Sequence, residues 1–141
     1  MMLNFRAIIT GVVIDIVGSI AGGLIFMSIY PTMMLSRGMG QAEIKQILAN
    51  PASSNELLWL LIAIGIFFDG LAGYVTARMA GYLEYWHVLA MIGLLTIVQF
   101  AMGGGEVFPA WVQFTGFLGG TTAAFFSAHR LKMKRLSLPR E

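Results

Sequence analysis

The segment Glu56–Ala80, ELLWLLIAIGIFFDGLAGYVTARMA, decides the fold of this chain. It exceeds the roughly 20 predominantly apolar residues that a helix needs to cross a bilayer, and one acid, Asp69, lies near its middle. Small residues surround this acid at three- and four-residue steps, which places them on one helical face. They are Gly65, Ala72, Gly73, Thr76 and Ala80. The segment therefore predicts a membrane helix with a carboxyl group on its packing face.

The composition of the whole chain agrees with this prediction. The 141 residues are 57% hydrophobic and only 11% charged, whereas a water-soluble domain carries about 25% charged residues. Seventeen glycines suit a helix bundle in which backbones approach closely. The absence of cysteine excludes disulfides, thiolate nucleophiles and cysteine-ligated metals. We expect one transmembrane domain over residues 1–141.

Four apolar segments are each near the length of one membrane crossing. Their approximate ranges are 7–30, 57–80, 85–102 and 108–128. Backbone groups in lipid must hydrogen-bond within their own segment, so these segments should be helices. The alternation typical of a membrane β-barrel is missing. The sequence predicts an all-α, integral membrane four-helix bundle, with Pro31 ending the first helix.

The connection after the first helix is the only long one. Its residues 41–50 have the pattern of a short amphipathic helix, with Ile44, Ile47 and Leu48 on one face. We expect this helix in the first external loop, where it lies on the membrane surface or covers the mouth of the bundle. A glycine-rich run at residues 103–107 is expected to be a turn, because it lacks the lysine of a phosphate-binding loop.

The distribution of lysine and arginine predicts the orientation. Cytoplasmic loops carry an excess of these residues, and a cytoplasmic N-terminus leaves only Arg37 and Lys45 outside. The other seven are then inside: Arg6, Arg78, Arg130, Lys132, Lys134, Arg135 and Arg140. We predict both termini in the cytoplasm (N-in/C-in) and a multi-pass protein of a bacterial inner membrane.

The tail at residues 129–141 is basic with interleaved apolar residues. We expect this cytoplasmic tail to bind anionic lipid headgroups, at about 1 kcal/mol per charge near the surface. Nucleic acid is not an expected partner, because no aromatic stacking platform accompanies the charges. His87 and His129 should lie at the same membrane interface, and neither a metal nor any other cofactor is expected.

A second acid, Asp15, lies in the first apolar segment on a face of small residues. That face also holds Gly11, Gly18, Ser19 and Gly22. Asp15 is about nine residues and Asp69 about eleven residues from the cytoplasmic end, which puts both about 12–17 Å deep. Because consecutive helices are antiparallel, the two carboxyls should face each other. We expect at least one to keep its proton near neutral pH, since isolated charges are costly there.

Three interpretations of the two acids stay open. In the first, Asp69 and Asp15 carry a proton or cation, and the neutral ligands come from Ser19, Thr76, Thr10 or Gln99. In the second, the two acids form a neutral hydrogen-bonded pair that joins the helices. In the third, they contact a partner subunit. Seven glycines are predicted to pack helices together. They are Gly11, Gly18, Gly22, Gly65, Gly73, Gly116 and Gly120.

Two functional hypotheses follow. The first is a small proton- or cation-coupled transport protein, which works as a homo-oligomer because four short helices enclose little space. The second is a non-enzymatic assembly or scaffold subunit, whose glycine-rich helix faces dock a larger membrane complex. No arrangement of nucleophile and base is recognisable, so an enzyme is not expected.

Overall fold

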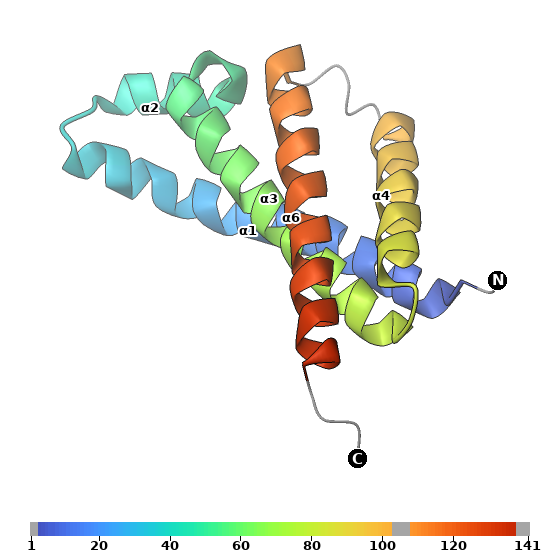
Figure 1. Cartoon of the computed structure of the whole chain (residues 1–141). Coiled ribbons are helices and arrows are strands. Elements are labelled where there is room, and N and C mark those ends of the chain that lie inside the picture. The colour runs from blue at the N-terminus through green and yellow to red at the C-terminus, as the bar shows by residue number, and fades with distance from the viewer. Residues whose placement is uncertain (1–2, 103–107, 138–141) are drawn as a thin grey trace.

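A computed structural model of the protein (Figure 1) describes residues 3–102 and 108–137. The turn predicted at residues 103–107 and Arg140 of the tail lie outside them. The described residues form five α-helices and one 3-10 helix without a strand, which confirms the all-α prediction. The elements are α1 (Phe5–Ser36), α2 (Gln41–Ala49), η1 (Pro51–Ser53), α3 (Asn55–Ala80), α4 (Glu84–Ala101) and α6 (Ala110–Leu136).

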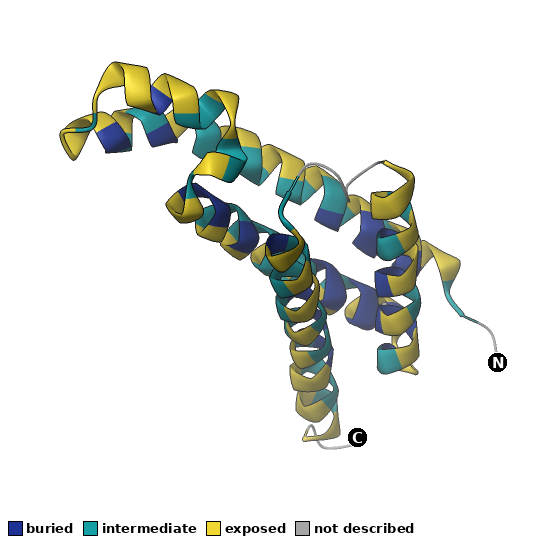
Figure 2. Ribbon diagram, turned by 90° about the horizontal axis from the view of Figure 1, so that it is seen from above, coloured by how far each residue is buried: buried dark blue, intermediate teal, exposed yellow. Residues whose placement is uncertain are grey.

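Three described helices, α1, α3 and α4, are long and apolar enough to cross a membrane. The outward sides of the helices are largely exposed (Figure 2). Large apolar side chains are exposed there, including Val17, Leu24, Phe67 and Ile97. Soluble monomers rarely leave so much apolar surface uncovered, so this surface fits contact with lipid. Helix α6 is also long, but glycines, threonines and a basic C-terminal end make it less apolar.

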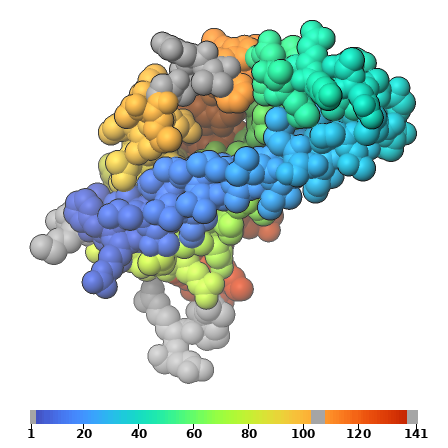
Figure 3. Space-filling view, turned by 180° about the vertical axis from the view of Figure 1, so that it is seen from behind, coloured from blue at the N-terminus to red at the C-terminus, as the bar shows by residue number. Residues whose placement is uncertain are grey.

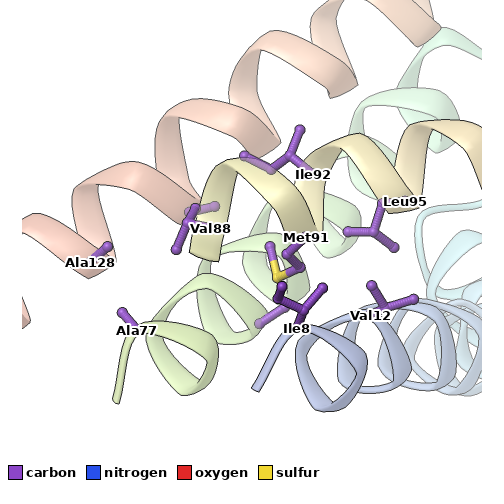
Figure 4. Packing of buried hydrophobic residues seen from close by; sticks show 10 residues of the cluster. Ile8, Val12, Ala77, Val88, Met91, Ile92, Leu95 and Ala128 are labelled. Atoms are coloured by element: carbon purple, nitrogen blue, oxygen red, sulfur yellow. The ribbon is translucent and has the colours of Figure 1, made fainter. Parts of the chain in front are cut away.

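Helix α3 is the centre of the arrangement, because it packs along α6 and also against α1 and α4. Helix α1 is steeply inclined to α4 and α6 (Figure 1) and extends across the molecule when seen from behind (Figure 3). The main core lies where these four helices meet, with Ile8 and Val12 of α1 against Met91 and Leu95 of α4 (Figure 4). Helices α3 and α6 contribute alanines to this core, and these small side chains let the two backbones approach.

Helix α1 does not end at Pro31, which corrects the sequence prediction. It continues through the proline to Ser36, although proline has no N–H with which to reach the carbonyl of Met27. Tyr30 and Met34, on either side of Pro31, are both buried, and their packing holds the helix together there. At about 1.5 Å per residue, α1 is about 48 Å long. This length exceeds the hydrocarbon thickness of about 30 Å. A tilt of the helix would shorten the distance that it spans along the membrane normal.

Helix α2 packs against the C-terminal part of α1. Ile44 is buried among Tyr30, Met34 and Leu57, while the opposite side of α2 is exposed. The backbone reverses between the helices at Gly38, whose φ of +85° suits a residue without a side chain. The C-terminal part of α1 and helix α2 thus form an arm that extends away from α4 (Figure 1).

The N-terminal end of α1, the turn between α3 and α4 and the C-terminal end of α6 gather at one end of the molecule. The backbone N–H of Asn4 donates to Nε2 of His87 at 2.8 Å. Arg135 of α6 forms an ion pair with Glu84 at 2.9 Å and donates to the carbonyl of Arg78 at 3.0 Å. These contacts put the first and last described helical ends on the same side of the protein.

Candidate functional site

Asp15 of α1 and Asp69 of α3 meet where the two helices pack together. Their carboxyl groups lie close enough to interact with each other, as the similar depth of the two acids predicts. A hydrogen bond between them requires a proton on one of them, because an ionised carboxylate offers only acceptors. Asp15 is buried, with 6% of its surface exposed, and Asp69 is half-buried. The two acids are therefore unequally accessible.

Glycines on α1 bring this helix close to α3 on both sides of Asp15. A Cβ at Gly18 would overlap the ring of Phe68, and a Cβ at Gly22 would lie 2.8 Å from the same ring. The Phe68 side chain thus occupies the space that the two missing side chains leave, directly beside Asp69 in the chain. A Cβ at Gly11 would overlap the Thr76 hydroxyl. These three glycines thus lie where α1 and α3 approach closely.

Packed side chains close the contact between α1 and α3 on the side of the chain termini. The Thr76 hydroxyl is fully buried and can donate to the Ala7 carbonyl at 3.3 Å or to Sδ of Met91 at 3.1 Å. Thr76 follows Asp69 by two helical turns, about 10 Å along the axis. Its hydrogen bonds therefore join α3 to α1 and α4, which differs from the predicted role as a ligand beside the acids.

The other predicted neutral ligands have different positions. Ser19 is half-buried and lies one helical turn after Asp15 on the same face of α1. Thr10 is half-buried near the start of α1, five residues before Asp15. Gln99 lies near the end of α4, where it lines a cavity that also reaches Asp69. Of the four candidates, Ser19 and Gln99 thus have positions compatible with the predicted role.

The cavity lies between α3, α4 and α6 and has a volume of about 350 Å³. In Figure 3 the molecule is hollowed between α4, in yellow, and the green end of α3, with α6 behind in orange-brown. Asp69 is the only acid among its described lining residues. The remaining polar lining residues are Thr96, Gln99, Gln113 and Thr121.

Gly65 and Gly116 line this cavity, which corrects their prediction as packing positions. A Cβ at either residue would meet nothing within 4 Å. The physical reason is that these glycines face the space between α4 and the pair of α3 and α6, where no described side chain fills it. Gly65 and Gly116 thus leave space for the cavity, whereas Gly11 and Gly18 allow two helices to contact each other.

The last two predicted packing glycines do join α3 to α6. A Cβ at Gly73 would lie 2.6 Å from Cα of Ala124, and a Cβ at Gly120 would overlap Oδ2 of Asp69. The Asp69 carboxyl thus lies directly over the α6 backbone. Gly120 leaves the space into which this carboxyl fits, between Asp15 on one side and the cavity on the other.

The two histidines are structural groups at the end of the molecule that holds the chain termini. His87 is fully buried; its Nε2 accepts from Asn4, and its Nδ1 lies 3.0 Å from the carbonyl of Leu83. The imidazole thus joins α1 to α4 from a buried position. His129 lies 2.8 Å from the Tyr85 hydroxyl, with which it shares a hydrogen bond.

The cavity and the unsatisfied oxygen of Asp15 are the features that sequence reasoning missed. Oδ1 of Asp15 is buried and has no hydrogen-bond partner among the described residues. Polar residues on the cavity-facing sides of α4 and α6, such as Gln99 and Thr121, were the available signal. Their convergence on Asp69 depends on helix rotation and tilt, which periodicity alone does not determine.

Comparison of the chain with known protein families, with curated proteins and with solved structures finds no match. The chemistry of the site follows from its geometry instead. Of the two acids, only Asp69 is among the described lining residues of the cavity, and Asp15 is buried beside it. The site is thus open toward the cavity and closed by Thr76 and Met91 on the other side.

Proposed function

We propose that the protein is a small multi-pass membrane protein in which α1, α3, α4 and α6 all cross the bilayer. The contacts that gather both terminal ends of the helices support an arrangement with both ends on one side of the membrane, which we propose is the cytoplasmic side. Basic residues at that end, including Arg6, Arg78 and Lys134, fit the charge excess of cytoplasmic segments. The arm of α1 and α2, with Arg37 and Lys45, would lie on the opposite side.

We infer that its function is proton- or cation-coupled transport, with Asp69 as the exchanging group and Asp15 as its buried partner. One observation carries this inference: two acids lie against each other where α1 packs on α3, and one of them lines a cavity. Ionisable groups inside a membrane bundle are costly and typically mark ion or proton pathways. A pair that shares protons can exchange one for a cation without leaving a bare charge in lipid.

The geometry suggests how such exchange would proceed. With the bundle as it stands, Asp69 takes up or releases its proton through the cavity, while the contact of Gly11 with Thr76 keeps the other side closed. Passage to the other side requires α1 to shift relative to α3, which would open this contact. The glycines of α1 present little side-chain bulk to such a shift, because they contact α3 through backbone atoms.

The alternative, an assembly subunit that docks through glycine faces, has less support. Five of the seven predicted packing glycines are already in close contact within the chain. They are Gly11, Gly18, Gly22, Gly73 and Gly120. A partner helix could use these faces only by displacing α1, α3 or α6. Formation of a homo-oligomer stays a prediction.

The test is proton flux in proteoliposomes, driven by a potassium diffusion potential and followed with a pH-sensitive dye inside the vesicles. We expect Asp69→Asn to abolish flux and Asp15→Asn to lower it at least tenfold. An asparagine at either position can still donate to the remaining carboxylate, so the helix contact should persist. Glu43→Gln is the matched control, because Glu43 is an exposed acid on α2 and its loss should leave flux unchanged.

Infrared difference spectra across a pH titration provide the second measurement. A buried carboxylic acid band that changes with pH in the wild type should change or disappear in both asparagine variants. Flux at the wild-type level in both variants would contradict the transport proposal. If the same variants shifted the assembly state instead, as measured by mass in nanodiscs, the scaffold hypothesis would replace it.

A further inference from the structure

The cavity between α3, α4 and α6 has the features of a binding site for a small organic molecule. Its volume of about 350 Å³ falls at the lower end of the range for ligand sites, about 300–1,000 Å³. Most of its lining is apolar, with a few polar groups that converge from different helices. Gly65 and Gly116 keep it open from two sides.

We propose that this cavity binds a small apolar molecule with a single positive charge, namely a protonated amine on an aromatic or branched hydrocarbon body. The proposal rests on the proposed transport function, for which it names the substrate class. A charged group in the substrate would be the cation that exchanges with a proton at Asp69.

The charges of the cavity favour a cation. Asp69 is the only ionisable residue among the described lining residues, and no lysine, arginine or histidine lies among them. An anionic ligand would therefore have no counter-charge and would face a carboxyl group. An ammonium group has only donors, which match the acceptor oxygens of Asp69 and the side-chain carbonyl of Gln99.

The apolar walls fit the rest of such a ligand. Phe100 of α4 and Phe117 of α6 line the cavity, and aromatic faces attract organic cations. Leu61, Ile66 and Leu95 provide aliphatic walls on the other sides. A metal cation would leave these walls without contacts, whereas a hydrocarbon body fills them.

The balance of protons links this binding site to the acid pair. If Asp15 and Asp69 together hold two protons, they are neutral, and binding of an ammonium group releases one proton. If they hold one proton, the pair is negative and the ammonium group neutralises it with no release. The amine and a proton therefore compete for the same negative charge, and amine affinity should rise as pH rises until the amine itself loses its proton.

The experiment measures binding of radiolabelled 2-phenylethylamine to the full chain in nanodiscs, with empty nanodiscs as the background. Unlabelled 2-phenylethylamine should displace it at concentrations at least tenfold lower than the neutral 2-phenylethanol. The anionic 3-phenylpropionate should not compete. Saturation should occur near one amine per chain.

Glycine variants test where the amine binds without removing a polar group. Gly116→Leu should lower the affinity at least tenfold, because its side chain would extend into open cavity space. Gly93→Leu is the matched control: Gly93 also has open space around it, but it does not line the cavity. Asp69→Asn should lower the affinity by a similar factor.

Three results would overturn the proposal: equal competition by amine and alcohol, equal binding in Gly116→Leu and Gly93→Leu, or no saturable binding at all. The transport function can fail separately. A titrating carboxylic acid band with proton flux but no amine binding would reject the substrate class alone. Amine binding without proton flux in the wild type, when an inward gradient of 2-phenylethylamine is also applied to the vesicles, would reject the transport function and leave a binding site.

Discussion

Replacement of Gly73 by alanine should destabilise the protein, whereas the same change at Gly116 should not. Both glycines lie within long helices, α3 and α6 respectively. The gain in helix propensity from glycine to alanine is up to about 1 kcal/mol and is common to both variants. It therefore cancels in the comparison, and what remains is the difference in surroundings.

The structure gives the magnitude of that difference. A Cβ at Gly73 would lie 2.6 Å from Cα, 2.7 Å from the carbonyl oxygen and 2.8 Å from Cβ of Ala124. Carbon atoms prefer separations of about 3.5–4.0 Å, so α3 and α6 would have to move apart by about 1 Å. Two of the three opposing atoms belong to the backbone and cannot rotate away. Overpacking of this kind costs about 1–3 kcal/mol.

Reversible unfolding in mixed micelles, with increasing sodium dodecyl sulfate and circular dichroism as the signal, measures both variants. We expect Gly73→Ala to be less stable than Gly116→Ala by about 1–3 kcal/mol. Gly116→Ala should match the wild type or exceed it, because nothing lies within 4 Å of its new methyl group. Equal stability of the two variants would refute the assignment of Gly73 to a close helix contact and of Gly116 to a cavity.

Three further predictions concern stability and use the same assay. Tyr30→Phe should leave stability unchanged or raise it by up to about 1 kcal/mol, because the buried Tyr30 hydroxyl has no partner among the described residues; a clear loss would indicate a partner for that hydroxyl. Pro31→Ala should stabilise α1 by up to about 3 kcal/mol, since it restores a missing backbone hydrogen bond, and a destabilised variant would contradict this reasoning. Arg135→Ala should cost about 1–3 kcal/mol, because it leaves the largely buried Glu84 carboxylate without its ion-pair partner, and Glu84→Gln in the same background should recover part of that loss.

The sequence predicted the helices and the meeting of the two acids for the same physical reason. Lipid leaves a helix as the only arrangement that satisfies the backbone of each apolar segment. Once the segments are helices, residue counts fix depth, and equal depth on consecutive helices brings Asp15 and Asp69 together. The small residues around them then allow the contact, as the overlap of a Gly18 side chain with Phe68 indicates.

What the sequence did not predict depends on helix direction. Gly65 and Gly73 lie on one stripe of α3, yet one faces a cavity and the other contacts α6. Pairwise spacing cannot separate these cases, because the tilt of one helix across another decides which part of a stripe is covered. Pro31 is a similar case. The proline removes a backbone hydrogen bond of the helix, but Tyr30 and Met34 on both sides of it are buried, and their packing keeps the helix continuous.

The two acids have unequal surroundings, because Asp15 is buried and Asp69 is half-buried. Apart from the Asp69 carboxyl group, the buried Oδ1 of Asp15 has no hydrogen-bond partner among the described residues, and an unsatisfied buried acceptor costs about 1–3 kcal/mol. A structural pair that only joined helices would lower its free energy by satisfying this oxygen, and a serine or threonine on the facing side of α3 would be sufficient. The chain has Phe68 beside Asp69 instead, and its Thr76 hydroxyl is directed to Ala7 and Met91. Under the proposed function, Oδ1 of Asp15 would accept the proton or cation that arrives through Asp69.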